Sequence, residues 1–227
     1  MAVLELPLFP LGIVLFPGTP QLLHIFEPRY RQMLADCLEG NRRFGVSFVK
    51  TVEGTDPTPE LGTVGCSAIV QESRLLPDGR SHILALGEDR YVLLDVLTTD
   101  LPYRCARVET FDDDDVEPPQ LAELATQVRG GFQQFVEGME LLNDRGTDQL
   151  DLARDPKQLS FQVSAALELD GEVKQELLGL RSTLERLTQL HRLLRPLNEE
   201  LRRRVTVHVR ARGNGGGGRT GDIVTDP

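Results

Sequence analysis

The sequence predicts an α+β protein in which a small β-barrel is followed by an α-helical bundle. Three observations lead to this fold class. Residues 1–110 contain at least six short runs typical of strands and one helical pattern. Residues 120–204 repeat apolar side chains every three or four positions, as amphipathic helices do. An acidic run that ends in two prolines, FDDDDVEPP at 111–119, separates the two patterns.

The chain begins with two predicted strands and a turn. Leucines alternate with other residues over 4–8, which predicts a half-buried strand. The apolar run at 11–18 ends in Pro17-Gly18, a turn dipeptide, and 21–26 predicts another strand.

A helix is predicted from Pro28 to Gly40. Proline is tolerated in the first turn, where its missing N–H costs nothing, and glycine is well suited to end a helix. Apolar residues recur between them at helical spacing: Tyr30, Met33, Leu34, Cys37 and Leu38.

Four more strands are predicted at 43–49, 61–76, 80–97 and 103–111, with a tight turn at Pro77-Asp78-Gly79. About six strands with one helix in this length favour a closed or nearly closed barrel.

The C-terminal half predicts four helices: 121–143, one that Asp155-Pro156 begins, 171–180, and 182–204. Ser182 and Glu185 have the spacing of a capping box, and Pro196 predicts a kink in the last helix. After it, VTVHV alternates like a strand, so helix and strand both stay open for 204–210.

These patterns predict four segments. They are a barrel at 1–110, an acidic linker at 111–119, a helical bundle at 120–204 and a tail at 205–227 that is largely disordered from about 212.

Composition excludes several classes of function. The formal net charge is −10, which argues against non-specific nucleic-acid binding, since phosphate neutralisation needs an excess of Lys and Arg. No apolar stretch is long enough to span a bilayer, and the N-terminus lacks the basic start of a signal peptide. Three widely spaced cysteines are typical of reduced thiols. We therefore expect a soluble cytoplasmic protein with no membrane partner.

No catalytic, metal or cofactor motif is present. The sequence contains no phosphate-binding G-x-x-x-x-G-K-[ST] loop, no G-x-G-x-x-G, and no close pairing of His or Cys that would ligate a metal. Glu88-Asp89, the most conspicuous acidic pair, is expected in a hairpin turn, and neighbouring strand residues point to opposite faces. We predict no catalytic residue, no metal, no cofactor and no enzymatic activity.

Several segments carry a resemblance to a known family. The opening contains Leu6-Pro7-Leu8-Phe9-Pro10, Phe16-Pro17-Gly18 and Phe26-Glu27-Pro28-Arg29-Tyr30-Arg31. Gly62-Thr63-Val64-Gly65 and Leu76-Pro77-Asp78-Gly79-Arg80 follow, and then, in the helical half, Asp155-Pro156, Leu167-Glu168-Leu169, Lys174-Gln175-Glu176-Leu177-Leu178 and Glu185-Arg186-Leu187. From about residue 4 to about 200 the chain resembles the amino-terminal substrate-binding domain of ATP-dependent Lon proteases, especially the stand-alone bacterial proteins that carry only that domain.

The resemblance implies a PUA-like β-barrel followed by a helical bundle, which in full-length Lon captures unfolded or tagged substrates. It implies neither ATP hydrolysis nor peptide cleavage here, because a glycine-rich tail stands where the ATPase would follow. We expect a non-catalytic module that binds unfolded or extended polypeptide, as an adaptor or holdase in protein quality control, with a separate Lon protease as one candidate partner. RNA binding, known for PUA-like barrels, is the alternative, and a hydrolase with an unrecognised site is the third hypothesis. The oligomeric state stays open.

The candidate protein-binding residues are Phe16, Phe26, Arg29, Tyr30 and Arg31. An exposed aromatic offers apolar contact, Tyr30 offers stacking, and the two arginines can pair with carboxylates. In the alternative interpretation Phe16 and Phe26 belong to the barrel core, and Glu27 pairs with a nearby arginine to hold the helix.

Overall fold

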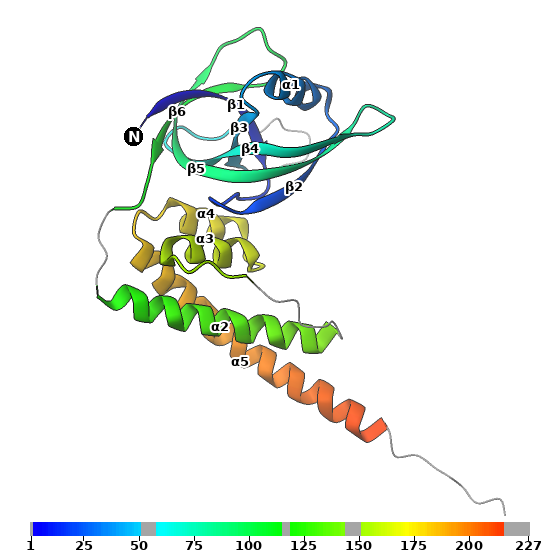
Figure 1. The fold of residues 1–227 in the computed structure, drawn as a ribbon, viewed down its shortest axis with the longest axis vertical. Coiled ribbons are helices and arrows are strands. Elements are labelled where there is room, and N and C mark those ends of the chain that lie inside the picture. Colours follow the sequence, from blue (N-terminus) through cyan, green and yellow to red (C-terminus); the bar gives the residue numbers. More distant parts are fainter. Residues whose placement is uncertain (1, 51–57, 115–118, 144–150, 216–227) are drawn as a thin grey trace, which may run out of the picture.

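The computed structural model describes residues 2–50, 58–114, 119–143 and 151–215, with side chains as far as His208. It is an α+β fold in which a six-stranded mixed sheet with one helix is followed by four helices (Figure 1). None of the described helices is long and apolar enough to cross a bilayer.

The strands form one sheet that closes on itself. They are β1 (Val3–Leu11), β2 (Pro20–Ile25), β3 (Arg43–Phe48), β4 (Val64–Leu75), β5 (Ser81–Leu97) and β6 (Cys105–Phe111). Their order is β2-β5-β4-β3-β1-β6, and β6 also pairs with β5, so that five strands complete a ring and β2 lies outside it. The β1–β3 pair is parallel and the other pairs are antiparallel.

Strand β5 has 17 residues and pairs with β4 along one edge and with two strands in turn along the other. Its first part pairs with β2, and its second part, from Arg90, pairs with β6. Register shifts next to Leu93 on the β6 side and in two places on the β4 side bend the strand, as β-bulges do. The prediction of a hairpin turn at Glu88-Asp89 is wrong, because both residues lie inside β5, where Glu88 accepts hydrogen bonds from Arg43 at 2.6 and 2.9 Å.

The turn at Pro17-Gly18 is confirmed, and it fixes where β2 begins. Gly18 has φ +67°, a left-handed conformation that glycine adopts at little cost. Its N–H donates to the carbonyl of Gly87 at 2.8 Å, and the N–H of Gly87 donates back to the carbonyl of Thr19 at 3.0 Å. The turn is therefore tied to the middle of β5.

Helix α1 (Pro28–Glu39) covers one opening of the ring (Figure 1). Pro28 occupies its first turn, and the N–H of Gly40 donates to the carbonyls of Asp36 and Cys37, as the sequence predicts. The helix buries Tyr30, Met33, Leu34 and Cys37 against the sheet.

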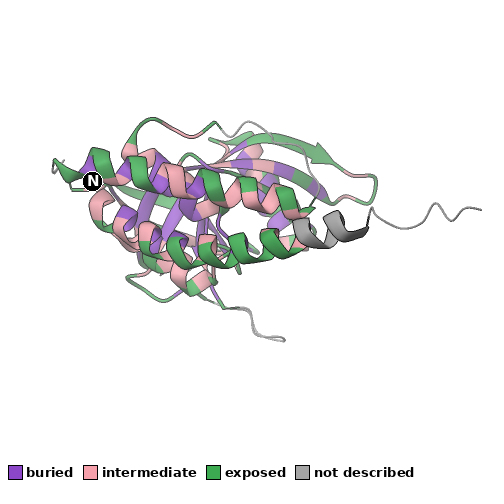
Figure 2. Ribbon diagram, turned by 90° about the horizontal axis from the view of Figure 1, so that it is seen from below, coloured by how far each residue is buried: buried purple, intermediate pink, exposed green. Residues whose placement is uncertain are grey.

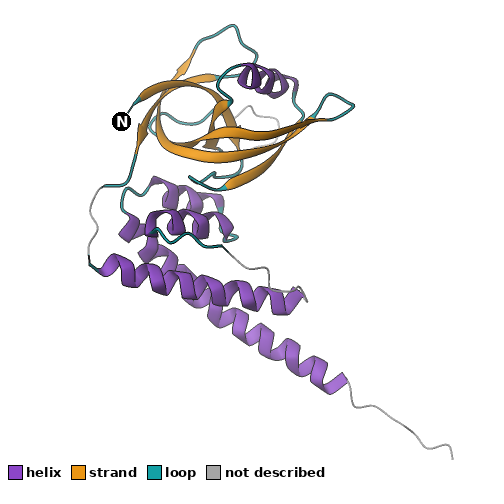
Figure 3. Ribbon diagram, in the orientation of Figure 1, coloured by secondary structure: helices purple, strands orange, loops and turns teal. Residues whose placement is uncertain are grey.

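The four C-terminal helices are α2 (Gln120–Asn143), α3 (Pro156–Ala166), α4 (Gly171–Gly179) and α5 (Thr183–Gly215). The short pair, α3 and α4, lies between the sheet and the long pair, α2 and α5 (Figure 3). Buried residues gather where these layers face one another, while the outer surfaces of the long helices are largely exposed (Figure 2).

Both predicted N-caps are present. The Asp155 carboxylate accepts from the N–H of Gln158 at 2.8 Å, and Ser182 Oγ accepts from the N–H of Glu185 at 3.2 Å. Helix α5 continues from residue 204 through 215, so 204–210 is helix and not strand, and 212–215 is helical where disorder is predicted. A helix already formed gains one hydrogen bond for each residue added. Helix α5 ends at Gly215, and residues 216–227 lie outside the described part of the chain.

A buried ion cluster joins the sheet to the helices. Asp113, just after β6, accepts hydrogen bonds from Arg90 of β5 and from Arg186 of α5. The two arginine side chains are 1% and 0% exposed and the Asp113 side chain is 6% exposed. Arg90 also donates to the carbonyl of Leu178 at 3.1 Å, and Arg186 donates to Ser160 Oγ at 2.7 Å. The acidic run predicted as a linker therefore holds a structural carboxylate at its start.

Replacing Asp113 by Asn should lower the free energy of unfolding by about 3 kcal/mol, because two buried guanidinium groups lose their counter-charge. Urea denaturation of Asp113→Asn measures this. The matched control is Asp114→Asn, which changes an exposed neighbour in the same acidic run and should cost less than about 0.5 kcal/mol. Equal effects of the two substitutions would refute a special role for Asp113.

The same carboxylate predicts acid sensitivity. Burial by itself raises the pKa of Asp113, but hydrogen bonding and attraction from Arg186, with the charge of Arg90, outweigh burial and leave the pKa below its usual value. A carboxyl whose pKa is lower in the folded state stabilises the protein fully above its unfolded pKa, near 3.9, and loses this effect as the pH falls through the folded value. Urea unfolding measured between about pH 6 and pH 2.5 should therefore show a steeper loss of stability below about pH 4 in the wild type than in Asp113→Asn.

Candidate functional site

Two of the five predicted binding residues are buried. Phe16 is 0% exposed in the core between sheet and helices, and its ring centroid lies 6.3 Å from that of Phe161. Tyr30 is 5% exposed and packs at 4.3 Å between ring centroids on Phe9. Phe16 is therefore a core residue, but it lies in the core between the sheet and the helices and not in the barrel core that the alternative interpretation gave it.

Phe26 is 57% exposed, so its interpretation as a core residue is wrong. It follows directly after β2, which lies at the edge of the sheet, and it continues the outward-facing row of Leu22 and His24. Its ring centroid lies 5.6 Å from that of His24. This row is exposed, whereas Leu23 and Ile25 on the opposite face of the strand are half-buried and buried.

The two arginines at the start of α1 have different surroundings. Arg29 forms an ion pair with Glu27 at 3.0 Å, and its Cζ lies 4.6 Å from the centre of the Tyr30 ring. The predicted pairing of Glu27 with a nearby arginine is thus confirmed. Arg31 is exposed and lies beside the β4–β5 turn, where its guanidinium fills the space that a Cβ on Gly79 would occupy.

Phe26, Arg29 and Tyr30 line one cavity of about 330 Å³, which we call the edge cavity. The end of β1 forms one side of it, and the end of β2 with the first turn of α1 forms the other. The remaining lining residues are Phe9, Pro10, Leu11, Gly12, His24, Ile25, Glu27 and Val49. The structure therefore brings three of the five predicted residues together and places Phe16 and Arg31 elsewhere.

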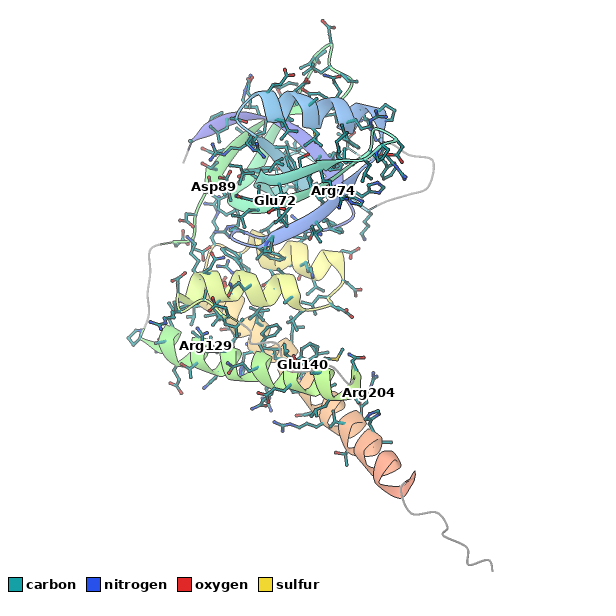
Figure 4. The ribbon with its side chains drawn as sticks, turned by 45° about the vertical axis from the view of Figure 1, so that its right-hand side comes forward. Glu72, Arg74, Asp89, Arg129, Glu140 and Arg204 are labelled. Carbon is teal, nitrogen blue, oxygen red and sulfur yellow. The ribbon has the colours of Figure 1, made fainter. Side chains whose placement is uncertain are left out.

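Strand β2 borders this cavity with an unpaired edge. Among the described residues it pairs only with β5, so its other edge offers backbone N–H and C=O groups to an added strand. Leu22 in its centre is 74% exposed. Beyond β5, the exposed charges of Glu72 and Arg74 on β4 border the same region of the sheet (Figure 4). An extended, partly apolar chain is the ligand that such an edge accepts without rearrangement.

Leu22, His24 and the free edge cannot be identified from the sequence alone. Both rows of β2 contain apolar residues, Leu22 with Phe26 on one and Leu23 with Ile25 on the other, so alternation alone does not tell which row faces outward. The pairing partners of β2 decide this, and they are distant in the sequence. The signal that the sequence offers for this site is a run of mostly apolar residues, 22–26, that follows a turn.

The described residues offer little covalent chemistry. All three cysteines are free, and burial raises the pKa of Cys37 to about 11, with a smaller contribution from Asp36, so that this thiol stays protonated near neutral pH. Burial likewise raises the pKa of Cys66. Within the described ranges, no group of three or more His, Cys, Asp or Glu side chains is arranged to hold a metal ion. What the site offers is an edge, an apolar cavity and charged groups at its border.

The chain is similar in sequence to known Lon proteases. The chain is 27% identical over 210 residues to the Lon protease of Syntrophomonas wolfei, which covers 91% of this chain and 26% of that protein. It is 29% identical over 214 residues to Lon protease 1 of Thermus thermophilus, covering 91% of this chain and 27% of that protein. The chain thus spans about a quarter of the length of these relatives.

Two solved structures share the fold. The Lon N-terminal domain protein from Xanthomonas campestris has a TM-score of 0.59 and 25% identity, covering 82% of this chain and 96% of that one. The N-terminal domain of Mycobacterium avium complex Lon protease has a TM-score of 0.64 and 15% identity, covering 86% and 98%, and shows the fold alone.

A family model described as the substrate-binding domain of ATP-dependent protease La (LON) matches residues 5–195, which include β2 to β6, most of β1, α1 and the edge cavity. The chain therefore belongs to the LON substrate-binding domain family.

Proposed function

We propose that this chain is a non-catalytic module that binds extended, apolar-rich polypeptides, acting as an adaptor or holdase in protein quality control. The observation that carries the proposal is the unpaired edge of β2 beside an apolar cavity, in a chain of the LON substrate-binding domain family. A cytoplasmic location and a separate Lon protease as partner belong to the same proposal.

Binding follows from strand addition. The backbone of a client pairs with the free edge of β2, and this pairing is independent of the client's sequence. Phe26 and the apolar wall of the edge cavity receive alternate side chains, which gives a preference for apolar clients. Tyr30 is buried and forms the floor of the cavity below Arg29, so its contribution is to position Arg29 and not to stack on the client.

The finer organisation is also part of the proposal. The closed ring of five strands supports a PUA-like barrel at 1–110, and the packing of α2 to α5 supports a helical bundle that begins at 120. The cluster at Asp113 indicates that the two parts act as one body, because it buries three charged groups between them.

Polypeptide is a better candidate ligand than RNA. The family is defined by substrate binding in a protease, and the net charge of the chain is −10. Around the edge cavity the charge of Arg29 is already paired with Glu27, which leaves little attraction for a phosphate backbone.

Replacing Phe26 by Ser should weaken binding of an unfolded polypeptide about fivefold, because an exposed aromatic anchor of an interface is worth more than about 1 kcal/mol. The probe is fluorescently labelled, reduced and carboxymethylated lactalbumin, which cannot refold, and the measurement is Kd by fluorescence anisotropy. Phe26 is 57% exposed, so its loss should leave the unfolding free energy almost unchanged.

Leu141→Ser is the matched control. Leu141 is also 57% exposed but lies on α2, far along the chain from the edge cavity. This variant should bind the probe like the wild type. If the wild-type protein does not bind the probe, the proposed function fails; if both variants lose affinity equally, the edge cavity is not the site.

A further inference from the structure

A second cavity, which we call the cleft, lies between the sheet and the helices and has a volume of about 480 Å³. The connection from β1 to β2 and the first residues of β2 form one wall, and α3, α4 and the segment before α3 form the other. Its apolar lining comes from both walls: Ile13, Val14, Pro20, Leu152, Ala165, Ala166 and Leu169. Arg129 of α2 (Figure 4) donates to the carbonyl of Leu152 at 3.0 Å and so fixes the segment that carries this wall.

Lys174 of α4 supplies a positive charge to this apolar cleft. Its Nζ donates to the carbonyl of Ala165 in the last turn of α3 at 2.8 Å, which uses one of its three protons. Within the described residues no carboxylate lies within ion-pair distance of this ammonium. Burial lowers the pKa of Lys174, and the charge of Glu168 opposes this effect. A carboxylate ligand would supply the close counter-charge that the described residues do not.

The other polar groups of the cleft leave Lys174 as its main anchor. Gln162 Oε1 already accepts the N–H of Ala153 at 2.8 Å. Asp151 is exposed at the border, where solvent screens its charge. A ligand with an apolar group and one carboxylate therefore matches the lining better than a cation or a neutral polar molecule.

The cleft and the edge cavity lie at the two ends of β2. The cleft contacts Pro20 and Gln21 at the start of the strand, and the edge cavity contacts His24 and Ile25 at its end. Gly12 borders both. A client added along the free edge of β2 therefore runs from one cavity to the other, a distance of roughly 20 Å for six strand residues.

We propose that the cleft captures the C-terminal residue of a bound polypeptide, with its apolar side chain among Ile13, Leu152 and Leu169 and its carboxylate on Lys174. This inference rests on the proposed function and deepens it, because it states which end of the client polypeptide is bound. It also fixes polarity: a chain whose C-terminus lies near Pro20 runs antiparallel to β2.

The test compares two labelled peptides that differ in one group. Both have eight residues, alternate valine and threonine, and end in leucine; one has a free C-terminal carboxylate and the other a C-terminal amide. The wild-type protein should bind the acid about tenfold more tightly than the amide, the difference expected for one charge-assisted hydrogen bond in a partly buried site.

Lys174→Gln should bring this ratio close to one while the affinity for the amide stays unchanged. Glutamine keeps a donor for the carbonyl of Ala165, so the end of α3 remains capped. Lys157→Gln is the control, since Lys157 pairs with Asp112 outside the cleft and its loss should leave the tenfold ratio intact.

A ratio near one in the wild type, with both peptides bound, overturns the inference and leaves the proposed function standing. A tenfold ratio that survives Lys174→Gln overturns the assignment of the carboxylate to Lys174. If the wild-type protein binds neither peptide and does not bind the unfolded lactalbumin, the proposed function itself is refuted.

A separate experiment tests the polarity of the bound chain. A photo-crosslinker at the peptide's first residue should label the region of Phe26, and labelling near Leu152 instead overturns the antiparallel arrangement.

Discussion

The shared burial of Arg90, Asp113 and Arg186 is the constraint on which the arrangement of this protein depends. Each arginine belongs to a different layer, one to the sheet and one to the last helix, and both pair with the same carboxylate. The Phe161 ring lies beside both guanidinium groups, 5.2 Å from Arg90 and 4.1 Å from Arg186. Buried charges tolerate little displacement, because a lost partner leaves an uncompensated charge at low dielectric. The orientation of the helices against the sheet is therefore set by this cluster, and apolar packing fills the space around it.

The two cavities follow from that orientation. Helices α3 and α4 are held against the start of β2, which creates the cleft, while the end of β2 extends past the helices toward α1 and leaves the edge cavity open. Neither half of the chain forms the cleft alone, since its walls come from residues 12–21 and 151–174. A polypeptide that uses both cavities would contact both the sheet and the helices. The stability of the packing between sheet and helices and the affinity for such a polypeptide would therefore be linked.

Local signals predicted the elements well, because their causes are local. Pro28 marks a helix start through its ring-restricted backbone, and Asp155 and Ser182 do so through side-chain oxygens that accept N–H groups of the first turn; the structure has helices there. The errors concern residues whose roles depend on distant partners. In the sequence Asp113 is one of four consecutive aspartates that look equivalent. Only the fold brings it, and not its neighbours, into contact with both Arg90 and Arg186. Glu88-Asp89 reads as a turn because charge is expected at turns, whereas pairing with Arg43 holds Glu88 inside a long strand. Which row of β2 faces solvent was likewise undetermined until the strand order was known, and the edge cavity could not be predicted without it.

An exposed strand edge beside apolar side chains carries a risk of self-association, and the composition of this chain counteracts it. Strand β2 is short, begins with a proline, and within the described part of the chain pairs on one side only. A second copy would have to bring its own edge against this one, and the net charge of −10 opposes the approach of two identical molecules. An unfolded client of low charge meets no such barrier. The acidic character that argues against nucleic acid thus also opposes pairing of this edge with the edge of a second copy.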